Sequence, residues 1–265
     1  MNCKNCHTEL PPNSDFCNHC GAKVIRNRLT FRNLFEHISE TFFNYDNKLL
    51  RTFLDLFARP DVVIGGYISG IRKRYVNPIS YFGLAITLTG IYLLTMNKFF
   101  PEAMDFSNFA FEGQEEIQRR NMNFVQEYMS LFMMLYIPIY ALIAKVTFVG
   151  LREFNYTEML VVFLYWQSQV SIVSALLGVL GACFGIANGL ISMSLLPLMV
   201  IYAAYMFKKL YKLTFGHIII RTLLFFGVGG AFFVVLSIVI GIVMFLNGDM
   251  QQIMEAQEAA RQASQ

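Results

Sequence analysis

The stretch Ile71-Arg72-Lys73-Arg74-Tyr75-Val76-Asn77-Pro78 separates two parts of the chain that differ in character. Polar segments and four cysteines precede it, whereas long apolar runs follow it. Arg72, Lys73 and Arg74 stand shortly before the first apolar run, and such a cationic cluster stays on the cytoplasmic side of a membrane. The Asn-Pro pair that closes the stretch predicts a helix start, because proline is favoured in the first helical turn. We therefore expect a membrane helix that begins in the cytoplasm.

The composition of the 265-residue chain also indicates a membrane protein. Hydrophobic residues make up 55% and charged residues 15%, and the mean hydropathy is +0.47. Apolar runs of about 18 residues or more with few charges are typical of membrane helices. We expect an all-α integral membrane protein with five transmembrane helices and a polar tail at residues 247–265. The predicted spans are residues 79–96, 128–149, 159–183, 190–207 and 222–246.

The distribution of positive charge favours a cytoplasmic amino terminus. With five spans, the carboxyl terminus then lies on the extracytoplasmic side. Four of the 21 Lys and Arg residues fall on that outer side, and the other 17 fall on the inner side. The four are Lys98, Arg119, Arg120 and Arg261. Because positive residues concentrate in cytoplasmic loops, we expect a multi-pass protein of a bacterial inner membrane in this orientation.

Four cysteines near the amino terminus form two Cys-x2-Cys pairs, with ten residues between the pairs. They are Cys3, Cys6, Cys17 and Cys20. Two such turns can present four thiolates to one metal ion, in a tetrahedral shell that suits structural zinc. Iron would also fit a four-cysteine site, and two disulfides are the alternative without a metal. A cytoplasmic head lies in a reducing compartment, which favours the metal.

The head, residues 1–25, is too short to fold through apolar burial alone. A segment of about 25 residues buries no useful core, so the metal must supply the folding free energy. His7 and His19 are expected on the surface, because four cysteines already fill the shell. The basic residues are scattered and lack interleaved aromatics, which argues against nucleic acid as a partner. We expect contact with a protein, or a purely structural role.

The arm at residues 26–78 predicts amphipathic helices with Phe and Leu on one face. Apolar residues at helical spacing predict helices at about residues 30–44, 46–58 and 60–75, the last weakened by three glycines. Helices of this kind can lie in the membrane interface. They can equally pack on one another or on the cytoplasmic ends of the spans, and the sequence leaves both placements open.

The apolar spans offer little catalytic chemistry. The chain has no HExxH or GxSxG motif, no phosphate-binding glycine loop and no carboxylate pair within a span. Gln167 and Gln169 form a polar patch in the third span, where they can bond neighbouring helices or line a polar path. We therefore expect a protein that is not an enzyme.

Part of the sequence is similar to a known family. The two cysteine pairs, Arg59-Pro60 and the pattern Tyr67-Ile68-x-Gly70-x-Arg72-x-x-Tyr75-x-Asn77-Pro78 together resemble a bacterial family of unknown function. The resemblance covers about residues 1–95 and implies a zinc ribbon joined to a multi-span membrane region, with the four cysteines as metal ligands. A cytoplasmic amino terminus followed by five spans also resembles the plan of Yip-type membrane-trafficking proteins, which is a likeness of architecture alone.

Two classes of function follow from these features. The first is a non-enzymatic scaffold or regulator whose zinc-binding head recruits a cytosolic or membrane protein. The second is a transporter or lipid-handling protein with a path along the third span. Membrane lipids are partners in both classes, and association of two copies of the chain is compatible with either.

Overall fold

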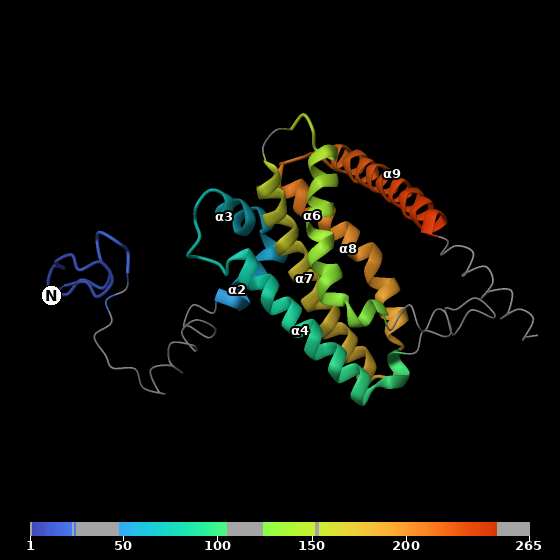
Figure 1. Cartoon of the computed structure of the whole chain (residues 1–265), viewed down its shortest axis with the longest axis horizontal. Coiled ribbons are helices and arrows are strands. Elements are labelled where there is room, and N and C mark those ends of the chain that lie inside the picture. The colour runs from blue at the N-terminus through green and yellow to red at the C-terminus, as the bar shows by residue number, and fades with distance from the viewer. Residues whose placement is uncertain (1, 23, 25–47, 105–123, 152–153, 248–265) are drawn as a thin grey trace, which may run out of the picture. The chain divides into compact units, whose positions relative to one another are not determined.

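The chain consists of two compact units, Met1–Leu49, which contains the head, and a helical bundle at Leu50–Gln265. The computed structural model describes residues 2–22, 24, 48–104, 124–151 and 154–247 (Figure 1). The predicted helix at residues 30–44, most of the loop after the first span and the polar tail beyond Asn247 lie outside the described residues.

The described part of the bundle is built from helices and the turns between them. In chain order these are α2 (Lys48–Ala58), η1 (Asp61–Gly65), α3 (Gly66–Ile68), α4 (Pro78–Phe99), η2 (Pro101–Met104), α6 (Met129–Thr147), α7 (Tyr156–Cys183), α8 (Asn188–Leu210) and α9 (Phe215–Asn247). Five of them, α4, α6, α7, α8 and α9, are long and apolar enough to cross a membrane. The predicted all-α membrane fold with five long apolar helices is therefore confirmed.

Local hydrogen bonds set the helix starts, which differ slightly from the edges of the apolar runs. At the start of α4, the Asn77 side chain accepts a 2.8 Å hydrogen bond from the Ser80 amide. At the start of α7, Asn155 and Glu158 form a reciprocal capping box. α9 begins at Phe215, seven residues before the predicted edge of the fifth span, so that Arg221 lies inside the helix.

The third helix of the arm is shorter than predicted. The residues after Pro60 form the π-helical turn η1 and then α3, which ends at Ile68. Gly70 follows with a φ of +103°, a backbone conformation that no helix contains and that side chains disfavour. The prediction of a helix up to Tyr75 is therefore wrong, and residues 71–77 form a loop that leads into α4.

The spans α4 and α7 run parallel and in contact. Near their starts the rings of Tyr81 and Tyr165 lie 6.1 Å apart. Further along, a Cβ at Gly178 would lie only 2.8 Å from the ring of Tyr92, so glycine permits this close approach. α6 runs antiparallel to α7, and near their connection Lys145 Nζ donates a 2.6 Å hydrogen bond to the Phe154 carbonyl.

One end of the bundle collects most of its positive charge. The starts of α4, α7 and α9 and the ends of α6 and α8 meet there (Figure 1). We call it the basic end. Its described cationic residues include Arg72, Lys73, Arg74, Lys145, Lys208, Lys209, Lys212 and Arg221.

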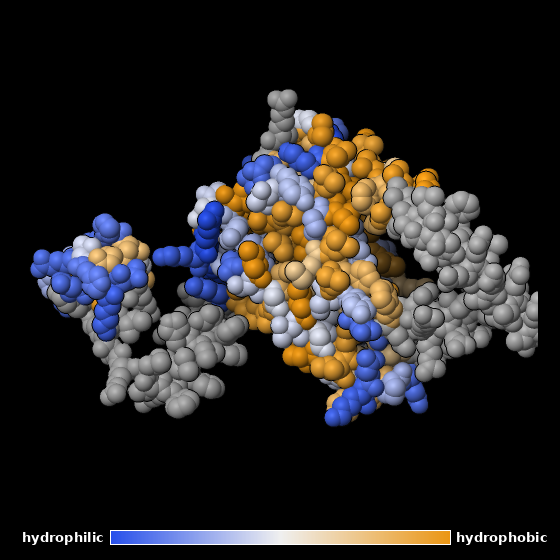
Figure 2. Space-filling model, in the orientation of Figure 1, coloured by the Kyte–Doolittle hydropathy of each residue, from blue (hydrophilic) through white to orange (hydrophobic). Residues whose placement is uncertain are grey.

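Large apolar side chains cover the outside of the bundle. Figure 2 shows hydrophobic residues over most of its visible face. Leu94 on α4 is 74% exposed and Leu223 on α9 is 67% exposed. An apolar surface of this extent is unfavourable in water. This surface is suited to contact with lipid.

Candidate metal centre and the junction before the first span

The sulfur atoms of the four cysteines in the head converge on one point. The Sγ atoms of Cys3, Cys6, Cys17 and Cys20 all lie within 4.8 Å of one another. The Cys3–Cys20 and Cys6–Cys17 sulfur distances are both 3.6 Å, far longer than the roughly 2.05 Å of a disulfide. The structure thus brings together all four predicted ligands as free thiols.

Two equivalent backbone turns hold the four sulfurs in place. The Cys3 amide donates a 2.9 Å hydrogen bond to the Thr8 carbonyl. The Cys3 carbonyl accepts a 2.9 Å hydrogen bond from the His7 amide. In the second turn, the Cys17 amide donates to the Ala22 carbonyl at 2.8 Å, and the Cys17 carbonyl accepts from the Gly21 amide at 2.9 Å. His7 and Gly21 occupy the same place in the two turns and have φ values of 59° and 70°. The left-handed residue in each turn lets the chain wrap around its first sulfur.

The donor set fits a tetrahedral metal ion. Bonds of about 2.3 Å from zinc to sulfur imply sulfur–sulfur separations of about 3.8 Å, close to the observed pairs. The Asn5 side chain and the Ala22 backbone lower the pKa of the Cys20 thiol to about 6 through hydrogen bonds, which favours the thiolate that binds metal. The four-cysteine cluster is therefore a metal site.

The rest of the head is small and open. Cys3, Leu10 and Cys17 form its core, and the partly buried Ala22 and Val24 pack against them. The exposed side chains include Phe16, at 52%, and both histidines. With so few apolar contacts, the fold of the head depends on the metal.

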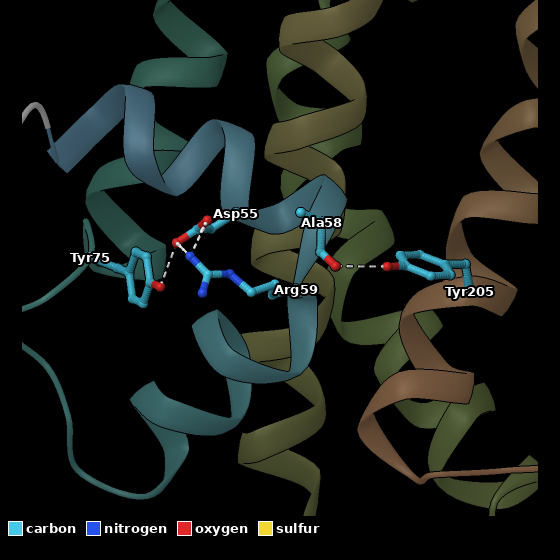
Figure 3. Close-up of polar contacts among 5 residues, drawn as sticks. All are labelled: Asp55, Ala58, Arg59, Tyr75 and Tyr205. Atoms are coloured by element: carbon cyan, nitrogen blue, oxygen red, sulfur yellow. Dashed lines mark hydrogen bonds and ion pairs between the residues drawn. The ribbon is translucent and has the colours of Figure 1, made fainter.

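The junction is the name we give to α2 together with the loop at residues 71–77. At its centre, the Asp55 carboxylate on α2 accepts a 2.6 Å hydrogen bond from the Tyr75 hydroxyl. Arg59 Nη2 donates to both oxygens of the same carboxylate, at 2.9 and 3.1 Å (Figure 3). The Tyr75 hydrogen bond, followed by Arg59, holds the pKa of Asp55 below its usual value.

The backbone that enters the first span is fixed from two sides. The Val76 amide donates a 3.0 Å hydrogen bond to Thr52 Oγ1 on α2. The Val76 carbonyl accepts a 2.7 Å bond from the Tyr165 hydroxyl on α7. The peptide just before Asn77-Pro78 is thus tied to α2 and to the third span.

A proline explains how α2 is attached to α8. Pro60 lacks the amide that would bond the Leu56 carbonyl in a continuous helix. The Tyr202 hydroxyl on α8 donates to that carbonyl at 3.2 Å. The Tyr205 hydroxyl on α8 also donates a 3.0 Å hydrogen bond to the Ala58 carbonyl (Figure 3). Of the two placements left open for the arm, the structure shows this part packed on the ends of the spans.

The two glutamines of the third span have different surroundings. Gln169 is fully buried, accepts a 2.6 Å bond from the Tyr81 hydroxyl and donates a 2.9 Å bond to the Phe53 carbonyl. Gln167 Nε2 donates to Ser171 Oγ on its own helix at 3.1 Å. Gln169 therefore connects α7 with α4 and α2, whereas Gln167 makes a local contact.

The cationic cluster lies in the junction loop and is exposed. Arg72 and Arg74 are placed over the rings of Tyr67 and Tyr75, at 5.5 and 5.4 Å from the ring centres. Lys73 between them is also exposed. The positive charges of the loop therefore face outward just before α4, and Tyr75 is the buried residue that follows them.

Sequence reasoning missed the polar core of the junction. Thr52, Asp55 and Leu56 form the buried face of α2, whereas Leu50, Leu54 and Phe57 are exposed. Asp55 with Arg59 four residues later on the same helix is the signal that could have revealed part of it. Tyr202 and Tyr205 carried no comparable signal.

Comparison with known proteins supports the division into a head and a junction. Residues 46–90 match a family described as a protein of unknown function, DUF3667, and residues 2–24 match the zinc-ribbon domain. The first match includes α2, the junction loop and the first half of α4. No curated protein and no solved structure matches the chain. The resemblance to a zinc-ribbon protein of a family of unknown function is thus confirmed in outline, and the likeness to Yip-type proteins stays a prediction.

Proposed function

We propose that this protein is a non-enzymatic membrane scaffold or regulator whose zinc-loaded head recruits a cytosolic protein. The observation that carries the proposal is the convergence of four thiols in a unit separate from the bundle. Four cysteines complete a tetrahedral shell and leave no open position for substrate, so a zinc ion there serves folding. A head that folds around a metal and exposes Phe16 is suited to binding another protein.

The bundle supplies the anchor. In this proposal it lies in a bacterial inner membrane, with the basic end in the cytoplasm and the carboxyl terminus outside. The polar groups of Gln169 are engaged by Tyr81 and Phe53, which favours a role in helix packing over a role in a transport path. In this proposal the bundle keeps the recruiting head attached to the membrane.

The test is affinity capture in mild detergent with three forms of the full-length chain. We compare the intact protein, Phe16→Ala, which keeps the metal ligands, and the double variant Cys17→Ser, Cys20→Ser. Recruitment by the folded head predicts a protein recovered with the intact chain and lost with the cysteine variant, with weaker recovery for Phe16→Ala. Equal recovery from all three forms would exclude the head as the recruiting surface.

A further inference from the structure

An apolar cavity of about 480 Å³ lies between α6, α7, α8 and α9. It begins at the basic end, where Phe148 and Ile218 are part of its wall, and extends beyond the middle of α8 and α9 to Leu196 and Phe233. The cavity falls within the usual size of ligand sites, about 300–1,000 Å³. Figure 1 shows α9 diverging from α8 along its length. Its wall is mainly apolar and includes the aromatic residues Tyr140, Phe163, Phe207, Phe225 and Phe226.

Arg221 and Trp166 are hydrogen-bond donors in this wall, which also includes the hydroxyls of Tyr140 and Thr222. Arg221 Nη1 is anchored on the carbonyls of Thr147 and Val149, at the end of α6. A guanidinium has five N–H donors, and no further bond of Arg221 is found among the described residues. Trp166 Nε1 is buried and also has no partner within the described part of the chain. The described wall contains no acidic residue that could neutralise Arg221.

These features define what the cavity can hold. A long apolar volume favours a hydrocarbon chain, because water inside it would find few hydrogen-bond partners. A fixed cation at the basic end requires an anion, and a guanidinium binds phosphate with particular strength. The buried indole N–H requires an acceptor deeper in the cavity, such as an ester carbonyl. One molecule in the surrounding bilayer combines all three groups.

We propose that this cavity binds one anionic phospholipid from the leaflet at the basic end. Its phosphate pairs with Arg221, an ester carbonyl accepts from Trp166 Nε1, and one acyl chain lies among the aromatic side chains. Lys208 and Lys209, at the end of α8, raise the local concentration of anionic lipid. The site is independent of the zinc head and adds lipid-dependent regulation to the proposed scaffold.

The only tryptophan of the chain makes the site observable, since Trp166 lines the cavity. The protein is reconstituted in phosphatidylcholine vesicles that contain increasing fractions of brominated phosphatidylglycerol or, in parallel, brominated phosphatidylcholine. Bromine on an acyl chain quenches tryptophan fluorescence on contact. We expect phosphatidylglycerol to quench with an affinity roughly tenfold above that of phosphatidylcholine. Both lipids carry the phosphate, but the choline cation of phosphatidylcholine is repelled by Arg221, Lys208 and Lys209.

Variants separate the site from ordinary contact with the bilayer. Arg221→Gln should make the two lipids quench equally, whereas Arg221→Lys should keep part of the preference. Lys212→Asn removes a nearby charge outside the cavity, at a left-handed position that asparagine accepts, and should change nothing. Gly230→Leu should lower quenching by both lipids, because leucine fits the open space at this lining position and fills it. Equal quenching by the two lipids in the unchanged protein, or no quenching by either, would overturn the proposal.

Discussion

The Tyr75 hydroxyl donates a 2.6 Å hydrogen bond to Asp55 Oδ2, which joins α2 to the loop before the first span across 20 residues of sequence. Tyr75 is 5% exposed, so water competes little for this bond. Arg59 is the second partner of the carboxylate, and it stands directly before Pro60, which ends α2. The end of α2 and the entry to the membrane are thus fixed by the same side chain.

Removing the tyrosine hydroxyl should destabilise the bundle. In Tyr75→Phe the largely buried Asp55 carboxylate loses a donor, and we expect the free energy of unfolding to fall by about 1–3 kcal/mol. Chemical unfolding in detergent, followed by helical circular dichroism, measures this change. Tyr67→Phe is the control, because it keeps the ring contact with Tyr165 and should change stability little. Equal stability of the two variants would show that the Asp55 bond contributes nothing.

The same carboxylate makes a pH-dependent contribution to stability. The pKa of Asp55 is lowered in the folded protein, by Tyr75 and then by Arg59, below the ordinary value of about 3.9. Its contribution is therefore complete above the ordinary pKa and is lost as the pH falls through the lowered one. We expect the difference in unfolding free energy between the unchanged protein and Asp55→Asn to be constant from about pH 7 to 5 and to shrink below about pH 4. A difference that grows on acidification would contradict this assignment.

The two glutamines of α7 offer a matched pair. Gln169→Leu leaves the Tyr81 hydroxyl and the Phe53 carbonyl without their partner in a buried place, so stability should fall by about 1–3 kcal/mol. Gln167→Leu removes only a local bond to Ser171 and should cost less than about 0.5 kcal/mol. Thermal unfolding in the same detergent compares them. The reverse order would instead favour a polar path that includes Gln167.

We expect the protein to bind one zinc ion per chain. Elemental analysis of the purified protein tests this, and the variant Cys17→Ser, Cys20→Ser should bind little or none. Because the head and the bundle are separate units, a strong chelator should remove the metal and leave the helical circular dichroism of the bundle unchanged. Iron in place of zinc, or full metal content in the variant, would refute the assignment.

The orientation can be measured with alkaline phosphatase, which is active only outside the cytoplasm. A fusion after Gly150, between α6 and α7 at the basic end, should be inactive. Fusions after Ala187, between α7 and α8, and after Asn247 should be active. An active fusion after Gly150 together with an inactive fusion after Ala187 would show that the bundle has the opposite orientation in the membrane.

Hydropathy and spacing were sufficient to predict the five spans and the metal ligands. Each span is an apolar run bounded by polar residues, and the cysteine pairs are local patterns of a few residues. Pro60 likewise predicted the end of α2 at Ala58, because its effect on the helix is local. Features whose cause lies within one or two turns of chain could be read directly.

The junction and the cavity could not be predicted in this way. Asp55 meets Tyr75, and Gln169 meets Phe53, only after helices far apart in sequence have packed together. The place of Arg221 beside the cavity depends on α9 starting well before its apolar run. These contacts arise from the angles between helices, which no single segment encodes.

The bond from Tyr202 to the Leu56 carbonyl also sets an order of events at the ribosome. The two residues are 146 positions apart, so synthesis at about 5–20 residues per second separates their appearance by roughly 7–30 s. Throughout that interval, water is the available donor for the carbonyl that Pro60 leaves open. The contact of α2 with α8 can therefore form only after the fourth span has been made, whereas its contacts with the junction loop and the third span can form earlier.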